Sequence, residues 1–310
     1  MLAYIIRRLI YMIPIILGVA FLVFVLFSAF GEDPVRVALG THATPQAIAE
    51  LQAKWGLDKP LPMQFLDFLR QIVTFDYGHS FNTGEPLSSL FWEGATVSLS
   101  LTAPPYFVAV ILFVSISLVI SYYRNSWVDR FSRALFVGMM SVTYLVYIIF
   151  LQYALAFELD LFPVRGYQPG FESIPYLMLP WLIFLVIGIG PDVRMYRTVF
   201  LDEIKADYVR TARAKGASEL RVLFVHILKN AMIPILTYTV VGIPFLILGA
   251  FLMERFFSIP GVGDLMINAI NTGDFPILKG LTITIAVGYA FFNLITDILY
   301  AYVDPRVQLD

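Results

Sequence analysis

The 310-residue sequence contains no cysteine and very little histidine. Without cysteine the chain has no disulfides, no thiol catalysis and no thiolate metal sites. The three histidines, His42, His79 and His226, lie far apart in the sequence, so we expect no metal site. The net charge is only −2, which gives nucleic-acid binding no electrostatic support.

Signatures of catalysis are missing as well. No phosphate-binding loop of the form G-x-x-x-x-G-K-[ST] occurs in the sequence. No Ser/His/Asp arrangement or carboxylate pair suggests nucleophilic or acid–base chemistry. We therefore expect a non-catalytic chain that binds no cofactor and does not itself hydrolyse ATP.

Apolar side chains, in contrast, are abundant. They make up 59% of the residues, charged side chains only 14%, and the mean hydropathy is +0.77. Soluble domains have about 45–50% apolar and about 25% charged residues. Continuous apolar runs of about 20 residues, enough to cross a bilayer, predict six spans. These spans are 9–30, 97–120, 134–157, 176–199, 233–253 and 280–303.

The predicted fold is an all-α membrane protein forming one transmembrane domain over residues 1–310. A β-barrel is excluded because the apolar runs are continuous and do not alternate. The first run follows Arg7 and Arg8 and is too long for the apolar core of a signal peptide, so we expect a retained span. Pro104, Pro105, Pro180 and Pro244 are expected to kink or end spans.

The distribution of lysine and arginine predicts the orientation. With the N-terminus in the cytoplasm, fourteen of the 21 basic residues, Arg306 among them, fall on the cytoplasmic side. Basic residues are enriched in cytoplasmic loops of membrane proteins. Both termini and the charged segment 200–232 are therefore expected in the cytoplasm, and the long loop 31–95 outside.

The external loop 31–95 has two amphipathic patterns. In the first, Thr44 is a candidate N-cap, Pro45 the first helical residue and Gly56 the stop signal. The second has helical spacing of Phe65, Phe68, Leu69, Ile72 and Val73. These helices either pack as a cap on the bundle or contact an external partner.

The charged segment 200–232 predicts two helices separated by Gly216. The first, from Asp202 to Lys215, is rich in charge, and Gly216 suits a left-handed C-terminal position. Ser218 is a candidate N-cap for the second helix. In it Leu220, Leu223, Phe224, Ile227 and Leu228 have the spacing of one apolar face. This face packs on its own bundle, on the membrane surface or in a groove of a partner.

The segment "ADYVRTARAKGASELRVLFVHILKNAMIPIL" makes a family resemblance visible. It resembles the EAA loop of the permease subunits of bacterial dipeptide and oligopeptide ABC importers. Arg210-Thr211-Ala212 stands in place of E-A-A, Gly216 is kept, and a proline comes late, at Pro234. Four further stretches resemble the same family: "YIIRRLIYMIPIILGV", "ATPQAIAELQAKWGLDKPLPMQFLDFLRQIVTFDYGHSF", "MERFFSIPGVGDLMINAINTGDFPILKG" and "NLITDILYAYVDPRV".

The resemblance implies a type I importer permease in the inner membrane, the first of two homologous permease subunits. The implied partners are the second permease, two cytosolic ATP-binding subunits that hold ATP and magnesium, and an external solute-binding protein. The transported solute would be a peptide, or alternatively glutathione, nickel or another small solute. The residues implied to dock on the ATP-binding subunit are Arg210, Thr211, Ala212, Arg213, Lys215, Gly216, Ala217, Leu220, Leu223, Phe224 and Ile227.

Two further groups are candidate sites. The turn "FSIPGVG" contains Phe257, Pro260, Gly261 and Gly263, and the resemblance implies that it shapes the outer gate. Asn293 and Asp297, four residues apart, share a face of the last span. They either serve a functional role within the membrane or form a pair inside the bundle near its end. An ion-coupled secondary transporter or an intramembrane enzyme would need more such groups.

Overall fold

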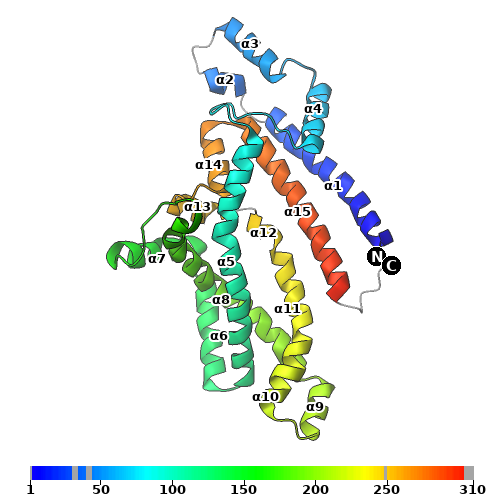
Figure 1. Ribbon diagram of the computed structural model, residues 1–310, viewed down its shortest axis with the longest axis vertical. Coiled ribbons are helices and arrows are strands. Elements are labelled where there is room, and N and C mark those ends of the chain that lie inside the picture. The colour runs from blue at the N-terminus through cyan, green and yellow to red at the C-terminus, as the bar shows by residue number, and fades with distance from the viewer. Residues whose placement is uncertain (1, 30–33, 40–43, 248–249, 304–310) are drawn as a thin grey trace.

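The computed structural model describes residues 2–29, 34–39, 44–247 and 250–303, and in these ranges it contains helices and no β-strand (Figure 1). Arg306 lies outside the described residues. The elements in chain order are α1 (Leu2–Ala29), α2 (Pro34–Leu39), α3 (Pro45–Trp55), α4 (Leu61–Thr74), α5 (Leu87–Tyr122), α6 (Trp127–Met140), α7 (Tyr144–Leu151), π-helical η1 (Gln152–Glu158), 3-10 helix η2 (Gly170–Ser173), α8 (Ile174–Ile204), α9 (Asp207–Ala214), α10 (Glu219–Arg221), π-helical η3 (Val222–Ile227), α11 (Leu228–Gly242), α12 (Pro244–Ile247), α13 (Phe251–Phe257), α14 (Val262–Thr272) and α15 (Phe275–Val303).

Among the described residues, five helical segments are long and apolar enough to span a membrane, and a bent pair makes a sixth. That pair, Trp127–Met140 and Tyr144–Glu158, is bent by 94° where the sequence predicts one span at 134–157. The segment predicted as the third span is therefore sharply bent between Met140 and Tyr144. Ser141 is the C-cap of α6, and Thr143, the N-cap of α7, has an extended backbone, so the chain leaves the helical path between Met140 and Tyr144.

The fifth predicted span, 233–253, is shifted toward the N-terminus. The apolar helical segment runs from Glu219 to Gly242, because the second helix of the charged segment continues directly into the membrane span. Pro244 has no N–H to donate to a continuing helix, and the chain restarts there as the four-residue α12. The fourth span also runs further than predicted, to Ile204.

Helices α5 and α8 lie side by side along the centre of the molecule, with α6 against α8 (Figure 1). Helix α1 lies along α15 on one flank, and α11 contacts both α8 and α15. The short helices α2 to α4 are at one end of the molecule, and α9 and α10 are at the opposite end (Figure 1). Many outward apolar side chains of the spans are exposed, such as Ile111 and Phe150, as expected of a lipid-facing surface.

The caps predicted for the first amphipathic helix are confirmed. The Thr44 hydroxyl accepts from the backbone N–H of Ala47, Pro45 is the first helical residue, and Gly56 is left-handed with φ of +67°. Trp55 then stacks on Phe81. These contacts fix the end of α3 against the segment that follows α4.

The second amphipathic helix, α4, packs on α1. Phe68 and Ile72 are buried, and the rings of Phe65 and Phe68 contact Phe24 of α1. Val73, predicted on the same face, is instead 81% exposed. Helix α4 thus covers the end of the bundle, which favours the packed-cap interpretation for this helix.

Candidate functional site

Residues 207–227 form a helical hairpin at one end of the molecule, here called the insert hairpin. Helix α9 covers Asp207–Ala214, and a turn leads to α10 and η3. The first helix was predicted to start at Asp202, but residues up to Ile204 belong to α8 and the chain changes direction at Ala206, which is extended. The hairpin is therefore shorter than the sequence predicts, and both its arms are joined to spanning helices.

Gly216 has the predicted left-handed conformation, with φ of +81°. Its N–H donates to the carbonyl of Arg213, and the N–H of Ala217 donates to that of Ala212, closing the end of α9. No heavy atom lies within 4 Å of the position a Cβ would take. Glycine is required there by backbone conformation and not by close packing.

Across this turn Arg213 forms a two-bond ion pair with Glu219. The guanidinium Nε and Nη2 donate to the two carboxylate oxygens at 2.8 and 3.1 Å. Glu219 also lies in the first turn of α10, where a negative charge is favourable. Ser218 is at the N-cap position as predicted, but its hydroxyl forms no capping hydrogen bond.

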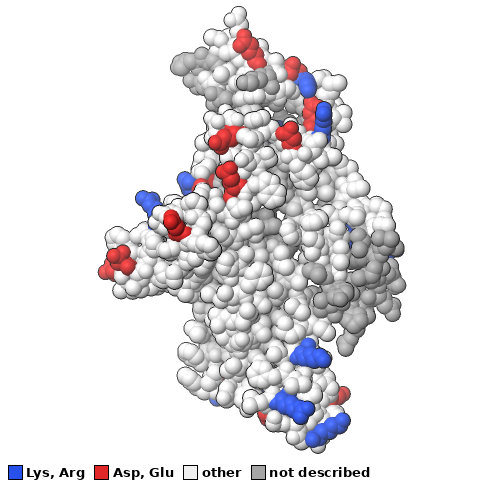
Figure 2. Space-filling view, in the orientation of Figure 1, with Lys and Arg blue, Asp and Glu red and all other residues white. Residues whose placement is uncertain are grey.

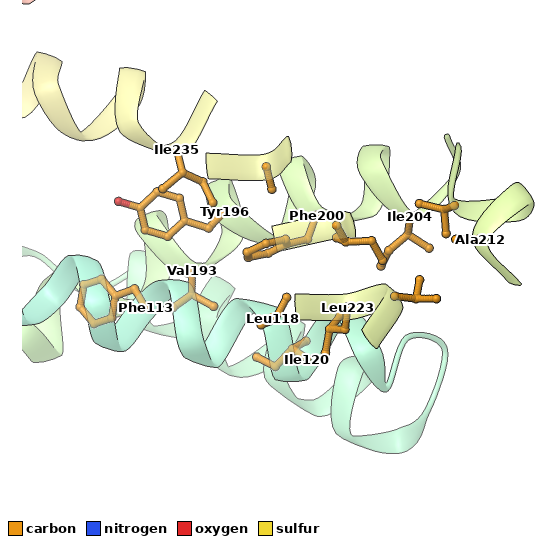
Figure 3. Close-up of a cluster of buried hydrophobic side chains, with 14 of the residues drawn as sticks. Phe113, Leu118, Ile120, Val193, Tyr196, Phe200, Ile204, Ala212, Leu223 and Ile235 are labelled. Carbon is orange, nitrogen blue, oxygen red and sulfur yellow. The ribbon is translucent and has the colours of Figure 1, made fainter. Parts of the chain in front are cut away.

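One side of the insert hairpin belongs to the largest apolar core of the described residues. Val209, Ala212, Val222, Leu223 and Ile227 are buried in the same cluster as side chains of α5, α8 and α11. Figure 3 shows this cluster running from Phe113 and Tyr196 to Leu223 and Ala212. The hairpin is thus packed onto the spanning helices along a continuous core.

The opposite side of the hairpin exposes apolar side chains. Leu220 is 64% exposed and Phe224 is 55% exposed, whereas Leu223 and Ile227 are buried. Leu228, the fifth residue of the predicted face, is partly buried against the core, so the prediction that all five residues share one face is wrong. Residues 222–227 form a π-helical turn with more residues per turn than an α-helix, so the 3.6-residue spacing does not apply there.

The other predicted docking residues lie mostly on the surface of the hairpin. Arg210 is exposed and makes only a loose ion pair with Asp207, at 3.4 Å. Thr211 and Lys215 are exposed, and Ala217 is half-buried against the core. The structure therefore brings the exposed charged residues and Gly216 together at the tip of the hairpin.

Two polar contacts near the hairpin were not predicted from the sequence. Asp129 of α6 is buried and pairs with Arg197 of α8 at 2.7 Å, which joins the two helices at the hairpin end. The hydroxyl of Tyr208 in α9 donates to Glu203 at the end of α8. Burial, and then the neighbouring Glu203 carboxylate, raise the pKa of the Tyr208 phenol. The Tyr208 contact ties the hairpin to α8, and the Asp129 pair holds α8 to α6.

The predicted turn "FSIPGVG" is organised around one buried carboxylate. Glu254 is fully buried and accepts from the Ser98 hydroxyl and the N–H groups of Ala250 and Asp264. A Cβ on Gly261 would overlap the Glu254 carboxyl group, and one on Gly263 would lie 2.8 Å from the Cα of Phe251. The glycines are required here by close packing.

The gate candidates divide between core and surface. Phe257 is buried and Pro260 is exposed. The turn they flank is held against α5 through Glu254 and Ser98, a residue of that span. This arrangement links the segment between the last two spans to the centre of the bundle.

Asp297 pairs with Arg8 of α1 at 3.1 Å. The two side chains are 47% and 32% exposed, so Asp297 pairs as expected but at the surface of the bundle and not in its interior. Asn293, one turn earlier on α15, is half-buried. The pair joins the first and last spanning helices on one flank of the molecule, near the N-terminus of α1 (Figure 1).

The sequence matches two protein families, and together the matched residues cover nearly the whole chain. Residues 112–309 match the binding-protein-dependent transport system inner membrane component, and residues 1–102 match the N-terminal region of such membrane components. The chain is 31% identical to the dipeptide transport system permease protein DppB of Alkalihalophilus pseudofirmus, over 99% of this chain and 100% of the relative. It is 32% identical to the glutathione transport system permease protein GsiC of Salmonella typhimurium, over 99% of each. With its spanning helices and insert hairpin, this chain belongs to the family of binding-protein-dependent transport system inner membrane components.

Proposed function

We propose that this chain is a pore-forming permease subunit of an ATP-driven importer that carries peptides across the cytoplasmic membrane. The observation that carries the proposal is the insert hairpin, which combines an exposed docking side with a buried side continuous with the spans. The named relatives include a dipeptide permease and a glutathione permease. The dipeptide permease favours a peptide as the solute of this chain, and the glutathione permease makes glutathione the competing candidate.

The proposed orientation places the insert hairpin in the cytoplasm. Figure 2 shows that acidic side chains predominate, with a few basic ones among them, at the end that carries α3 and α4, and that basic side chains predominate at the end that carries α9 and α10. This separation agrees with the tendency of cytoplasmic segments to carry lysine and arginine. Solute would then enter from the α2–α4 end, where an external binding protein docks.

The proposed mechanism is alternating access driven from the hairpin. Two cytosolic ATP-binding subunits, which hold ATP and magnesium, close on ATP binding and move the hairpins of this chain and of a second, homologous permease. Because Val209 and Leu223 share a core with Phe200 of α8, displacement of the hairpin is transmitted to the span as rigid-body rotation. Hydrolysis by the partners resets the spans, while this chain provides the path and performs no chemistry.

Reconstitution tests the proposal. The complex of both permeases and two ATP-binding subunits is placed in liposomes, and uptake of a labelled dipeptide is measured with the binding protein outside and ATP inside. We expect uptake that needs both ATP and the binding protein and survives a protonophore. Uptake by this chain alone, driven by a proton gradient, would overturn the proposal. Competition by unlabelled glutathione distinguishes the two solute classes.

A further inference from the structure

A cavity of about 550 Å³ lies among the middle parts of the spanning helices. It is lined by the middle of α5, by α8, by α12, by the first residues of α13, and by the first residue of α7 and the last of α11. This volume is within the range of small-molecule sites, about 300–1,000 Å³. Six of its lining residues are aromatic: Tyr106, Phe113, Tyr144, Phe184, Phe245 and Phe251.

One ionisable carboxyl group, that of Asp192 on α8, faces this aromatic cavity. Its Oδ1 accepts a hydrogen bond from the Tyr238 hydroxyl at 2.9 Å. Its Oδ2 lies on the side of Gly188, 3.5 Å from the position a Cβ there would take. Among the described residues Oδ2 accepts no hydrogen bond, and Asp192 is in none of their ion pairs. One oxygen is therefore held and the other is available to a ligand.

Glycines keep the space around this carboxylate open. A Cβ on Gly188 would lie 3.1 Å from the Phe113 ring as well as next to Asp192. A Cβ on Gly242 would lie 2.6 Å from the Tyr106 hydroxyl oxygen, so glycine there allows the tyrosine to lie across α11. That hydroxyl donates to the carbonyl of Thr239. The ring of Tyr106 is thereby fixed at the cavity wall.

A carboxylate among apolar side chains within a membrane is costly unless a cation meets it. Two features of the cavity select the kind of cation. Aromatic ring faces attract ammonium groups, while small hard metal ions prefer several oxygen ligands. The cavity offers aromatic rings and one carboxylate, which is the chemistry that recognises an organic ammonium group.

We propose that Asp192, oriented by Tyr238, binds the positively charged amino group of the solute as it passes through this cavity. The inference rests on the proposed function and deepens it, because an unmodified peptide carries such a group. Tyr238 is then a positioning residue, while Asp192 contacts the solute. Solutes without a cationic group pass this point poorly.

The charge preference of the cavity can be measured without any solute. Since the chain has no cysteine, Ile187→Cys places a single thiol in the cavity lining. Its modification rate in the assembled complex is measured with two methanethiosulfonates, one bearing a quaternary ammonium and one a sulfonate. We expect Asp192→Asn to lower the cation-to-anion rate ratio about fivefold or more, since opposite charges attract strongly at low dielectric. An unchanged ratio would overturn the proposal.

Transport provides the second measurement. Asp192→Asn keeps an oxygen that can accept from Tyr238, so the fold is preserved while the charge is removed. We expect peptide uptake to fall about tenfold, with binding-protein-stimulated ATP hydrolysis within about twofold of wild type. The matched control is Asp202→Asn, an exposed carboxylate at the far end of the same helix, which should change neither readout. Wild-type uptake by the Asp192→Asn complex would overturn the proposal.

The two measurements separate the two proposals. If the wild-type complex transports no peptide, the proposed function fails, yet the thiol ratio still reports whether the cavity selects cations. If the wild type transports peptide but Asp192→Asn changes neither ratio nor uptake, only the ammonium site fails.

Discussion

Arg213 and Glu219 close the insert hairpin by a two-bond ion pair, with nitrogen–oxygen distances of 2.8 and 3.1 Å across the Gly216 turn. Such parallel bonds fix the relative direction of two groups better than a single contact. The pair therefore sets the angle between the two arms, of which one continues from α8 and the other into α11. A hairpin that transmits force requires this angle to be constant.

Gly216→Ala is expected to reduce ATP hydrolysis stimulated by the binding protein. At φ of +81° a Cβ costs about 1–2 kcal/mol, so the turn opens or shifts. The effect should be severalfold, and larger for Gly216→Pro, because proline cannot adopt this φ. Gly138→Ala in α6 is the control, since its Cβ meets nothing within 4 Å and its backbone φ is not positive. If the Gly216→Ala and Gly138→Ala complexes hydrolyse ATP at the same rate, this role of Gly216 is contradicted.

A charge exchange tests whether Arg213 acts within the hairpin or on a partner. Arg213→Glu should weaken the coupling between ATP hydrolysis and the permease, because it places two negative charges together across the turn. The double variant Arg213→Glu with Glu219→Arg restores the pair in reverse. Coupled ATP hydrolysis should recover in the double variant if the pair serves the hairpin itself. No recovery would show that Arg213 is needed by the partner surface.

The two sides of the hairpin predict opposite phenotypes. Leu220→Ser and Phe224→Ser remove exposed side chains, so the chain should fold normally but co-purify with less ATP-binding subunit. Ile227→Ala removes a buried side chain, 1% exposed, and should destabilise the protein by about 2–5 kcal/mol. Thermal unfolding and the yield of the assembled complex distinguish these outcomes. A loss of stability in Phe224→Ser would contradict the placement of Phe224 on the exposed side of the hairpin.

Local rules recovered much of the molecule from the sequence. Continuous apolar runs located the spanning regions, and single residues placed helix ends, such as Thr44, Gly56 and Gly216. These features depend on neighbours within one helical turn. They are therefore visible in the sequence.

The features missed depend on non-local contacts or on departures from α-helical spacing. The π-helical turn at 222–227 separated Phe224 from Leu223, although both fit the same apolar period. Asp192 lies within the predicted span 176–199, whereas its partner Tyr238 is 46 residues away in the sequence. Glu254 and Ser98 are 156 residues apart. No local pattern signals which of several polar residues will meet.

Glu254 is expected to hold the turn between the last two spans. Glu254→Ala leaves the hydroxyl of Ser98 and the N–H groups of Ala250 and Asp264 without their acceptor in a buried site. Each buried donor left unpaired costs about 1–3 kcal/mol, so the thermal midpoint of the purified complex should fall clearly.

Glu254→Gln should have an intermediate effect, because its amide oxygen still accepts while its NH₂ group faces a backbone donor. Glu172→Gln, which changes an exposed carboxylate beside α8, serves as the matched control and should leave the midpoint unchanged. Gly261→Ala should resemble Glu254→Ala, since the added Cβ would overlap the Glu254 carboxyl group. If Glu254→Ala and Glu172→Gln unfold at the same temperature, the carboxylate does not anchor this turn, and the turn must be held by its apolar contacts alone.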